Sequence, residues 1–170
     1  MVRKETVLDS WKTVRQDTAQ AVEDFPAAEL DFKATPELMT FGELARHILD
    51  AGHALTGMLL DGVDNLATPQ FRETIGKYRP PLPESLDAAA LASELRKSVE
   101  TRTAELAAKG DDFFSGFITR FDGQRVTRLE MLQFVKEHEL THRSQMFLYL
   151  RLKGVVPATT RRRLAAQKGV

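Results

Sequence analysis

The chain has 170 residues, of which 42% are hydrophobic and 28% charged, values typical of one globular domain with a single core. Its 24 basic and 24 acidic side chains balance, which argues against nucleic acid as a partner. The absence of cysteine excludes disulfides, thiolate metal ligands and cysteine nucleophiles.

No stretch of the sequence approaches the roughly 18 uninterrupted apolar residues of a membrane span. The N-terminus begins with basic residues but lacks the apolar segment of a signal peptide. We therefore expect a cytoplasmic protein with no membrane association, folded as a single domain over residues 1–170.

The first two segments with helical periodicity cover residues 4–25 and 41–61. The first is ended by Pro26 and has one buried face, formed by Val7, Trp11, Val14, Thr18, Ala21 and Phe25. The second opens at a capping box, in which Thr40 and Glu43 satisfy free backbone N–H groups, and Gly62 ends it. Its buried stripe consists of Leu44, Ile48, Ala51, Leu55, Met58 and Leu59.

Two further helices are predicted at residues 86–109 and 127–153, and the last opens with a second capping box, Thr127 to Glu130. A long connection rich in proline and arginine covers residues 62–85. Short alternating runs around Asp122 and Gly123 predict a small β-hairpin before the fourth helix. The expected fold is all-α, an antiparallel four-helix bundle with one long crossing loop.

The fourth segment contains two histidines four residues apart, His138 and His142. At this spacing they lie one turn apart on one helical face, about 6 Å along the axis, so both imidazoles can reach one ion. Such a pair is often only a solvated surface feature. Here it continues the apolar stripe of its helix, and imidazoles directed into a core need polar partners, which a shared metal ion supplies. We therefore interpret the pair as metal ligands.

Two histidines alone would hold a divalent ion weakly, so a third ligand is expected. His47 lies on the buried stripe of the second helix, whereas His53 falls on the opposite side and is interpreted as a surface residue. We predict a metal site formed by His47, His138 and His142.

Residues 138–142 also match the H-E-x-x-H signature of zinc proteases. Such proteases need a third ligand downstream, and the sequence after His142 contains no histidine, aspartate or glutamate, which excludes this function. Glu139 therefore need not be a general base. It follows His138 directly and is rotated by about 100° from the ligand face, which favours a supporting hydrogen bond or a surface salt bridge.

Two segments resemble the DinB/YfiT-like superfamily of metal-binding four-helix bundles. They are TFGELARHILDAGHAL around His47 and TRLEMLQFVKEHELTHRSQMFLYLRLKGVVP around His138 and His142. Many members have glycine where this chain has Ser144, a departure that does not touch the ligands. The resemblance implies a three-histidine site for nickel, zinc, iron or manganese, a small-molecule substrate and a homodimer. Relatives include thiol S-transferases that use bacillithiol and a mycothiol-dependent isomerase.

The leading hypothesis is a metal-dependent transferase, in which a low-molecular-weight thiol is ionised at the metal and attacks a small electrophile. A metal-dependent hydrolase and a non-catalytic metal-binding bundle are the alternatives. The cavity beside the metal would distinguish them. A lining of cations favours thiol transfer, a carboxylate near the metal favours hydrolysis, and a closed cavity favours a structural ion.

Catalytic residues are not identified by the sequence, and the weak candidates are Glu139, Asp50, Tyr149 and Arg143. Asp50 is one turn after His47 and could orient that imidazole. In a hydrolase, either Asp50 or Glu139 could serve as the base. Tyr149 is interpreted as bundle core. Surface or dimer contacts are the first interpretation of Arg143 and Gln145. In the long connection, a roof over the site and a solvated loop are equally good interpretations of Arg72, Lys77, Tyr78 and Arg79.

Overall fold

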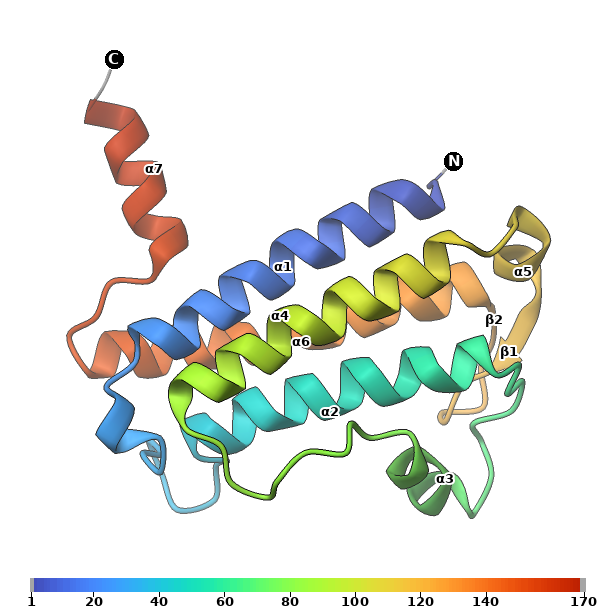
Figure 1. The fold of residues 1–170 in the computed structure, drawn as a ribbon, viewed down its shortest axis with the longest axis horizontal. Coiled ribbons are helices and arrows are strands. Elements are labelled where there is room, and N and C mark those ends of the chain that lie inside the picture. The colour runs from blue at the N-terminus through green and yellow to red at the C-terminus, as the bar shows by residue number, and fades with distance from the viewer. Residues whose placement is uncertain (1, 169–170) are drawn as a thin grey trace.

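The computed structural model describes residues 2–168, and within them it has four long helices that form a bundle (Figure 1). Met1 and residues 169–170 of the predicted domain lie outside this range. The long helices are α1 (Lys4–Asp24), α2 (Phe41–Leu60), α4 (Ala88–Ala107) and α6 (Arg128–Leu152). They agree to within a few residues with the four predicted segments, and the predicted all-α four-helix bundle is confirmed.

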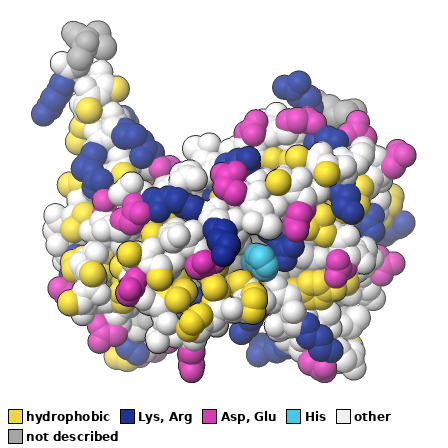
Figure 2. Space-filling view, viewed as in Figure 1, with side chains coloured by type: hydrophobic (Ala, Val, Ile, Leu, Met, Phe, Trp, Pro, Cys, Tyr) yellow, Lys and Arg dark blue, Asp and Glu magenta, His cyan; other side chains and the backbone are white. Residues whose placement is uncertain are grey.

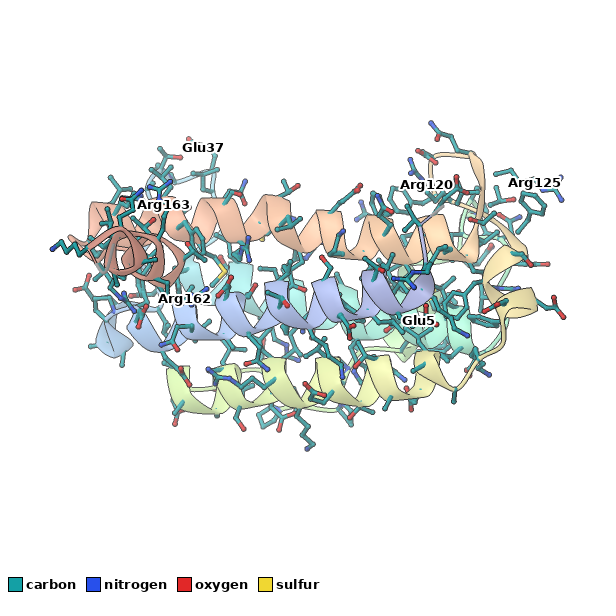
Figure 3. The ribbon with its side chains drawn as sticks, turned by 90° about the horizontal axis from the view of Figure 1, so that it is seen from above. Glu5, Glu37, Arg120, Arg125, Arg162 and Arg163 are labelled. Carbon is teal, nitrogen blue, oxygen red and sulfur yellow. The ribbon has the colours of Figure 1, made fainter. Side chains whose placement is uncertain are left out.

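Each long helix packs against two others. α1 and α2 each contact α4 and α6, so α1 and α2 occupy opposite corners of the bundle. Figure 3 shows α1 between α6 and α4. Two helices run in each direction, and α2 and α4 are parallel neighbours (Figure 1). This arrangement needs the long connection after α2, which returns the chain to the starting end of the bundle before α4 begins.

The predicted apolar stripes form the core. All six predicted positions of the first segment are buried, from Val7 on α1 to Phe25 at its C-cap. The core divides into two apolar clusters along the bundle axis, one containing Ile48 and Met146 and the other containing Leu55 and Val135. The three histidines lie on α2 and α6 at the height where these clusters meet.

Both predicted capping boxes are present. The Thr40 hydroxyl accepts from the Glu43 N–H at the start of α2, and Thr127 accepts from Glu130 in the same way at the start of α6. The predicted stop at Gly62 is confirmed as well, because its φ of 78° is a left-handed conformation that glycine adopts without strain. These local signals determine where the two ligand-bearing helices begin.

The predicted hairpin is formed by β1 (Phe117–Thr119) and β2 (Arg125–Thr127), which pair antiparallel with Ile118 opposite Val126. An isolated bridge between Asn65 and Thr119 ties the long connection to β1. The hairpin therefore closes the end of the bundle at which α2 ends and α6 begins.

Four short elements lie outside the predicted segments, namely a 3₁₀-helix (Ala27–Glu29), α3 (Phe71–Lys77), α5 (Asp111–Ser115) and α7 (Ala158–Lys168). α7 projects from the bundle, and basic side chains gather along it (Figures 1 and 2). The arginine run at its centre, with Arg162 and Arg163 labelled in Figure 3, is anchored to α1 by ion pairs to Asp17 and Asp24. Within residues 2–168 no helix combines the length and apolar character needed to cross a bilayer.

Candidate metal centre

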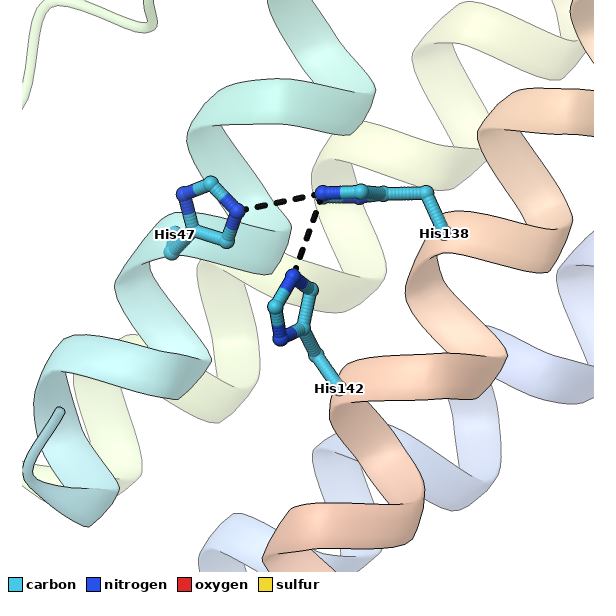
Figure 4. A group of neighbouring side chains, drawn as sticks. All are labelled: His47, His138 and His142. Carbon is cyan, nitrogen blue, oxygen red and sulfur yellow. Dashed lines mark hydrogen bonds between the residues drawn. The ribbon is translucent and has the colours of Figure 1, made fainter. Parts of the chain in front are cut away.

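Three imidazoles meet between α2 and α6. The Nε2 atom of His138 lies 3.1 Å from Nε2 of His47 and 3.2 Å from Nε2 of His142 (Figure 4). One ligand nitrogen from each ring lies within 4.8 Å of the other two, and all three side chains are partly buried. The structure thus brings together the three histidines predicted as metal ligands, in a group that could hold one ion.

Helix geometry explains the convergence. His138 and His142 are one turn apart on α6, so their rings project in the same direction. α2 runs antiparallel beside α6, and the Tyr149 hydroxyl donates to the Met39 carbonyl at 3.0 Å where α2 begins. Packing along the whole α2–α6 interface, with this contact at one end, brings His47 opposite the pair.

The positions of the three nitrogens are explained better by a shared cation than by hydrogen bonds among the three rings. The Nε2 atom of His138 lies within hydrogen-bonding distance of two other nitrogens, but a neutral imidazole nitrogen carries at most one proton and can satisfy only one of them. At the metal–nitrogen distance of about 2.0–2.1 Å found for zinc, nitrogens sharing one ion are roughly 3 Å apart. The observed spacing therefore suits a shared divalent ion.

The environment keeps two of these imidazoles neutral. The pKa of His138 is lowered to about 4, mainly by burial and then by the neighbouring His142 and His47. Burial is also the largest cause of the lowered pKa of His47, followed by His142. Asp50 opposes that shift and Arg79 adds to it. Both rings accordingly have a free lone pair at neutral pH, as metal ligation requires.

A supporting contact was missed by the sequence interpretation. The Nδ1 atom of His142 lies 3.0 Å from the amide oxygen of Gln145, although this residue was interpreted as a surface or dimer contact. A proton on Nδ1 donated to that oxygen leaves Nε2 as the lone-pair nitrogen facing the other rings. The three-residue spacing on one helix was the signal that could have predicted this pair.

An open cavity of about 450 Å³ adjoins His47. Its lining includes the acidic side chains of Asp31, Glu43, Asp50 and Glu84, with Arg46 as the basic one. The Arg46 Nε donates to Asp50 Oδ1 at 2.8 Å, while its Nη1 donates to the Pro83 carbonyl at 2.6 Å. The cavity beside His47 is thus open, and most of the charged side chains in its lining are carboxylates.

Two of the four catalytic candidates face α1 instead of the histidines. Glu139 is 2% exposed, and its carboxylate forms an ion pair with Arg15, which is 0% exposed. Of the two interpretations of Glu139, a supporting hydrogen bond or a surface salt bridge, the second is therefore wrong, because α1 covers that face of α6. The guanidinium of Arg143 is directed toward the Val14 carbonyl and Asp17, and burial lowers its pKa.

The other two candidates differ in their relation to the cavity. Tyr149 is buried and packs edge-on against Phe32, with ring centroids 5.6 Å apart, in agreement with its interpretation as core. Asp50 shares the cavity lining with His47, and its hydrogen bond is to Arg46. Among the four, Asp50 is therefore the candidate placed to meet a ligand in that cavity.

The interpretation of His53 as a surface residue is wrong. The ring is partly buried between α2 and α4, and its Nδ1 lies 3.0 Å from the Ser98 hydroxyl. Burial is the largest cause of its pKa being lowered to about 4, followed by the charge of Arg102. A helical wheel identifies only one buried face, whereas α2 contacts both α4 and α6 and therefore has two.

The proposed roof over the site is only partly present. Arg72 lines a separate cavity of about 330 Å³, and Lys77 forms an exposed ion pair with Glu73. Tyr78 lies against Gly57 on α2, and Arg79 is close enough to His47 for its charge to lower the pKa of that ring. Of these side chains, Arg79 is thus linked electrostatically to the histidines.

Residues 1–168 match the family model described as the DinB family. The chain belongs to the DinB family. The predicted family resemblance is therefore confirmed, and it covers nearly the whole chain. This DinB chain is also similar to the uncharacterised protein YjoA of Bacillus subtilis strain 168, with 23% identity over 158 residues that cover 91% of this chain and 93% of YjoA.

Solved structures of low sequence identity share the fold. The DinB-like YjoA structure superposes with a TM-score of 0.69 at 21% identity, covering 88% of this chain and 92% of that one. YfiT from Bacillus subtilis, described as a probable metal-dependent hydrolase with an unusual four-helix bundle topology, gives 0.70 at 17% identity and 91% coverage of both chains. A mycothiol-dependent maleylpyruvate isomerase gives 0.61 at 18% identity, covering 83% of this chain and 59% of its own.

Proposed function

We propose that this DinB protein binds one divalent metal ion through His47, His138 and His142, and that it catalyses hydrolysis of a small molecule there. The observation that carries this proposal is the convergence of three Nε2 atoms beside an open cavity in which four carboxylates outnumber the one guanidinium. Three imidazoles without a carboxylate or thiolate suit zinc, nickel or iron, and the family resemblance adds manganese to these candidates.

A divalent ion, when bound, acts as a Lewis acid that lowers the pKa of water or of a thiol at its open positions. The other catalytic groups would be side chains of the protein. Its three ligands are neutral, so they leave the full charge of the ion available at the site. Asp50 in the cavity would accept the proton released from water, and Arg46 holds its Oδ1 by a hydrogen bond of 2.8 Å.

The charged side chains of the cavity also indicate which charge a substrate should carry. Four carboxylates against one guanidinium repel an anion, so a neutral or cationic small molecule fits this cavity better. This differs from the lining of cations that would favour an anionic thiol. The charges of this cavity therefore support hydrolysis more strongly than the thiol transfer expected from the sequence.

Thiol transfer is the second candidate, and the position of Arg79 supports it. Its charge lowers the pKa of His47, so it lies close enough to the histidines to meet an anionic group of a thiol cofactor. The likeness in fold to a mycothiol-dependent isomerase is compatible with this chemistry.

Purified protein should be tested for metal content, and then assayed with a panel of neutral esters and amides and with low-molecular-weight thiols plus electrophiles. Hydrolysis that a chelator abolishes and zinc, nickel or manganese restores would support the first candidate. The Asp50→Asn variant should lose turnover while retaining metal, whereas Glu84→Gln, which changes another carboxylate of the cavity, should retain both. Thiol conjugation without hydrolysis would favour the second candidate, and absence of bound metal would contradict both.

We also expect a cytoplasmic homodimer without a nucleic-acid partner. Leu148 and Leu152 on the outer face of α6 are 54% and 56% exposed, an apolar pair that a second copy could cover. Basic side chains gather along α7, but over the bundle itself acidic and basic side chains are interspersed on the face shown in Figure 2. Light scattering after size-exclusion chromatography would measure the number of copies.

A further inference from the structure

A buried ion pair lies directly behind the histidines. Glu139 follows His138 on α6 and points to α1, where its carboxylate accepts four hydrogen bonds. Trp11 Nε1 donates to Oε2 at 2.8 Å, Thr18 Oγ1 donates to Oε1 at 2.8 Å, and Arg15 Nε donates to both oxygens at 2.8 and 3.0 Å. One residue beside a ligand is thus fixed by three side chains of a neighbouring helix.

Arg15 extends the same network to the other two helices. Its Nη1 is 3.4 Å from the Leu95 carbonyl of α4, and its Nη2 is 3.4 Å from the Ile48 carbonyl of α2. Ile48 directly follows His47, as Glu139 follows His138. A single guanidinium on α1 therefore contacts α2, α4 and α6, and it touches the neighbours of two of the three histidines.

α2 provides space for this guanidinium at Gly52. A Cβ atom at this position would lie 2.6 Å from Arg15 Nη2 and 3.3 Å from the Trp11 ring. Gly52 lies within a regular helix, where glycine is less favourable than alanine. Its presence there is explained by the close approach of Arg15.

Stability alone is a poor explanation for this pair. Removing two charges from water costs several kcal/mol for each ion, and replacing a buried pair by apolar residues of similar volume is often neutral or stabilising. A network that touches all four helices has a second effect, because it fixes the separation and rotation of those helices. The three histidines lie beside this network, and their convergence on one ion depends on the separation and rotation of α2 and α6.

We propose that Arg15 and Glu139 are positioning residues for the metal site. This inference rests on the proposed function, because it assigns the pair the task of holding α2 and α6 at the spacing that three ligands of one ion require. The pair contacts neither the ion nor the substrate, and it acts through the backbone next to His47 and His138.

The test is the double variant Arg15→Met with Glu139→Leu, which replaces the pair by apolar side chains. We expect it to fold with wild-type helix content and to bind zinc about 10- to 100-fold more weakly in a chelator competition. The visible spectrum of the cobalt-loaded protein, which reports the arrangement of ligands, should change as well. A double variant of the exposed α1–α4 pair, Glu23→Leu with Arg96→Met, is the matched control and should match wild type in both measurements.

A double variant that binds zinc with wild-type affinity and an unchanged cobalt spectrum would overturn the positioning role. If the double variant does not fold, Arg15→Lys takes its place, because lysine keeps the charge but cannot reach Ile48, Leu95 and Glu139 together. That variant should show the same weaker binding, and wild-type binding by it would overturn the inference. Wild-type protein that binds no metal would contradict the proposed function itself, which is a different result.

Discussion

The Nε2 atoms of His47 and His138 lie 3.1 Å apart although 91 positions separate the two residues in the chain. Their proximity depends on the antiparallel packing of α2 against α6, at one end of which Tyr149 donates a hydrogen bond to the Met39 carbonyl. His142 completes the group from the next turn of α6.

Replacing His138 by alanine should abolish stoichiometric metal binding. Its Nε2 is the atom that neighbours both other ligand nitrogens, so the remaining two histidines would hold an ion only weakly. Elemental analysis of the purified variant measures this directly. His53→Ala is the matched control, because His53 contacts Ser98 and should leave metal content unchanged. Full metal content in His138→Ala would show that the ligand assignment is wrong.

The metal-free protein should lose stability as the pH falls through the range in which His53 titrates. Its folded pKa is lowered to about 4 from an ordinary value near 6.5, so below pH 6.5 the unfolded chain takes up a proton that the folded chain does not. Above about pH 7 the His53 ring is neutral in both states and has no effect on the pH dependence of stability. Between pH 6.5 and pH 4 it lowers the free energy of unfolding progressively, by roughly 1–2 kcal/mol in total for a half-buried ring.

Chemical denaturation at a series of pH values, compared with a His53→Gln variant, isolates this contribution. The difference in unfolding free energy between the two proteins should depend on pH between 6.5 and 4. A constant difference over that interval would mean that burial of His53 does not lower its pKa.

The Gly52→Ala variant should be destabilised by about 1–3 kcal/mol, because the added methyl group would meet Arg15 in a packed core. Gly76→Ala in α3 is the control, since a Cβ there meets nothing within 4 Å and helix propensity favours alanine. Urea unfolding of both variants gives the comparison. Equal stability of the two would indicate that Arg15 moves away at no cost.

The Tyr149→Phe variant separates a structural hydroxyl from a catalytic one. Loss of the hydrogen bond to the Met39 carbonyl should cost about 0.5–1.5 kcal/mol of unfolding free energy. Metal content and the turnover number of the metal-loaded enzyme should stay at wild-type values, because the hydroxyl is engaged at the start of α2. A large fall in turnover with unchanged stability would return Tyr149 to the catalytic candidates.

Much of the bundle could be predicted because its signals are local. Capping boxes at Thr40 and Thr127 and apolar stripes of helical period identify elements from a few adjacent residues. The family resemblance and the inward position of His47 then supplied the group of three histidines that the structure brings together. Such signals depend only on neighbours along the chain.

The rest depended on contacts between distant segments. Glu139 was placed correctly off the ligand face, but its partner Arg15 lies 124 positions away and no local pattern connects them. His53 was misplaced because α2 is covered on two sides. The acidic cavity combines residues from the connection before α2, from α2 itself and from the segment before α4, so its charge could not be read from any one of them.

The pairing of α2 with α6 has a consequence for a chain without cysteine. An ion held by His47 and His138 would act as a crosslink that closes a loop of 91 residues, much as a disulfide does. Such a crosslink lowers the conformational entropy of the unfolded chain, and metal binding stabilises the folded chain. The melting temperature should therefore rise with metal concentration. The proposed catalytic metal site would then also crosslink two helices in a chain that cannot form a disulfide.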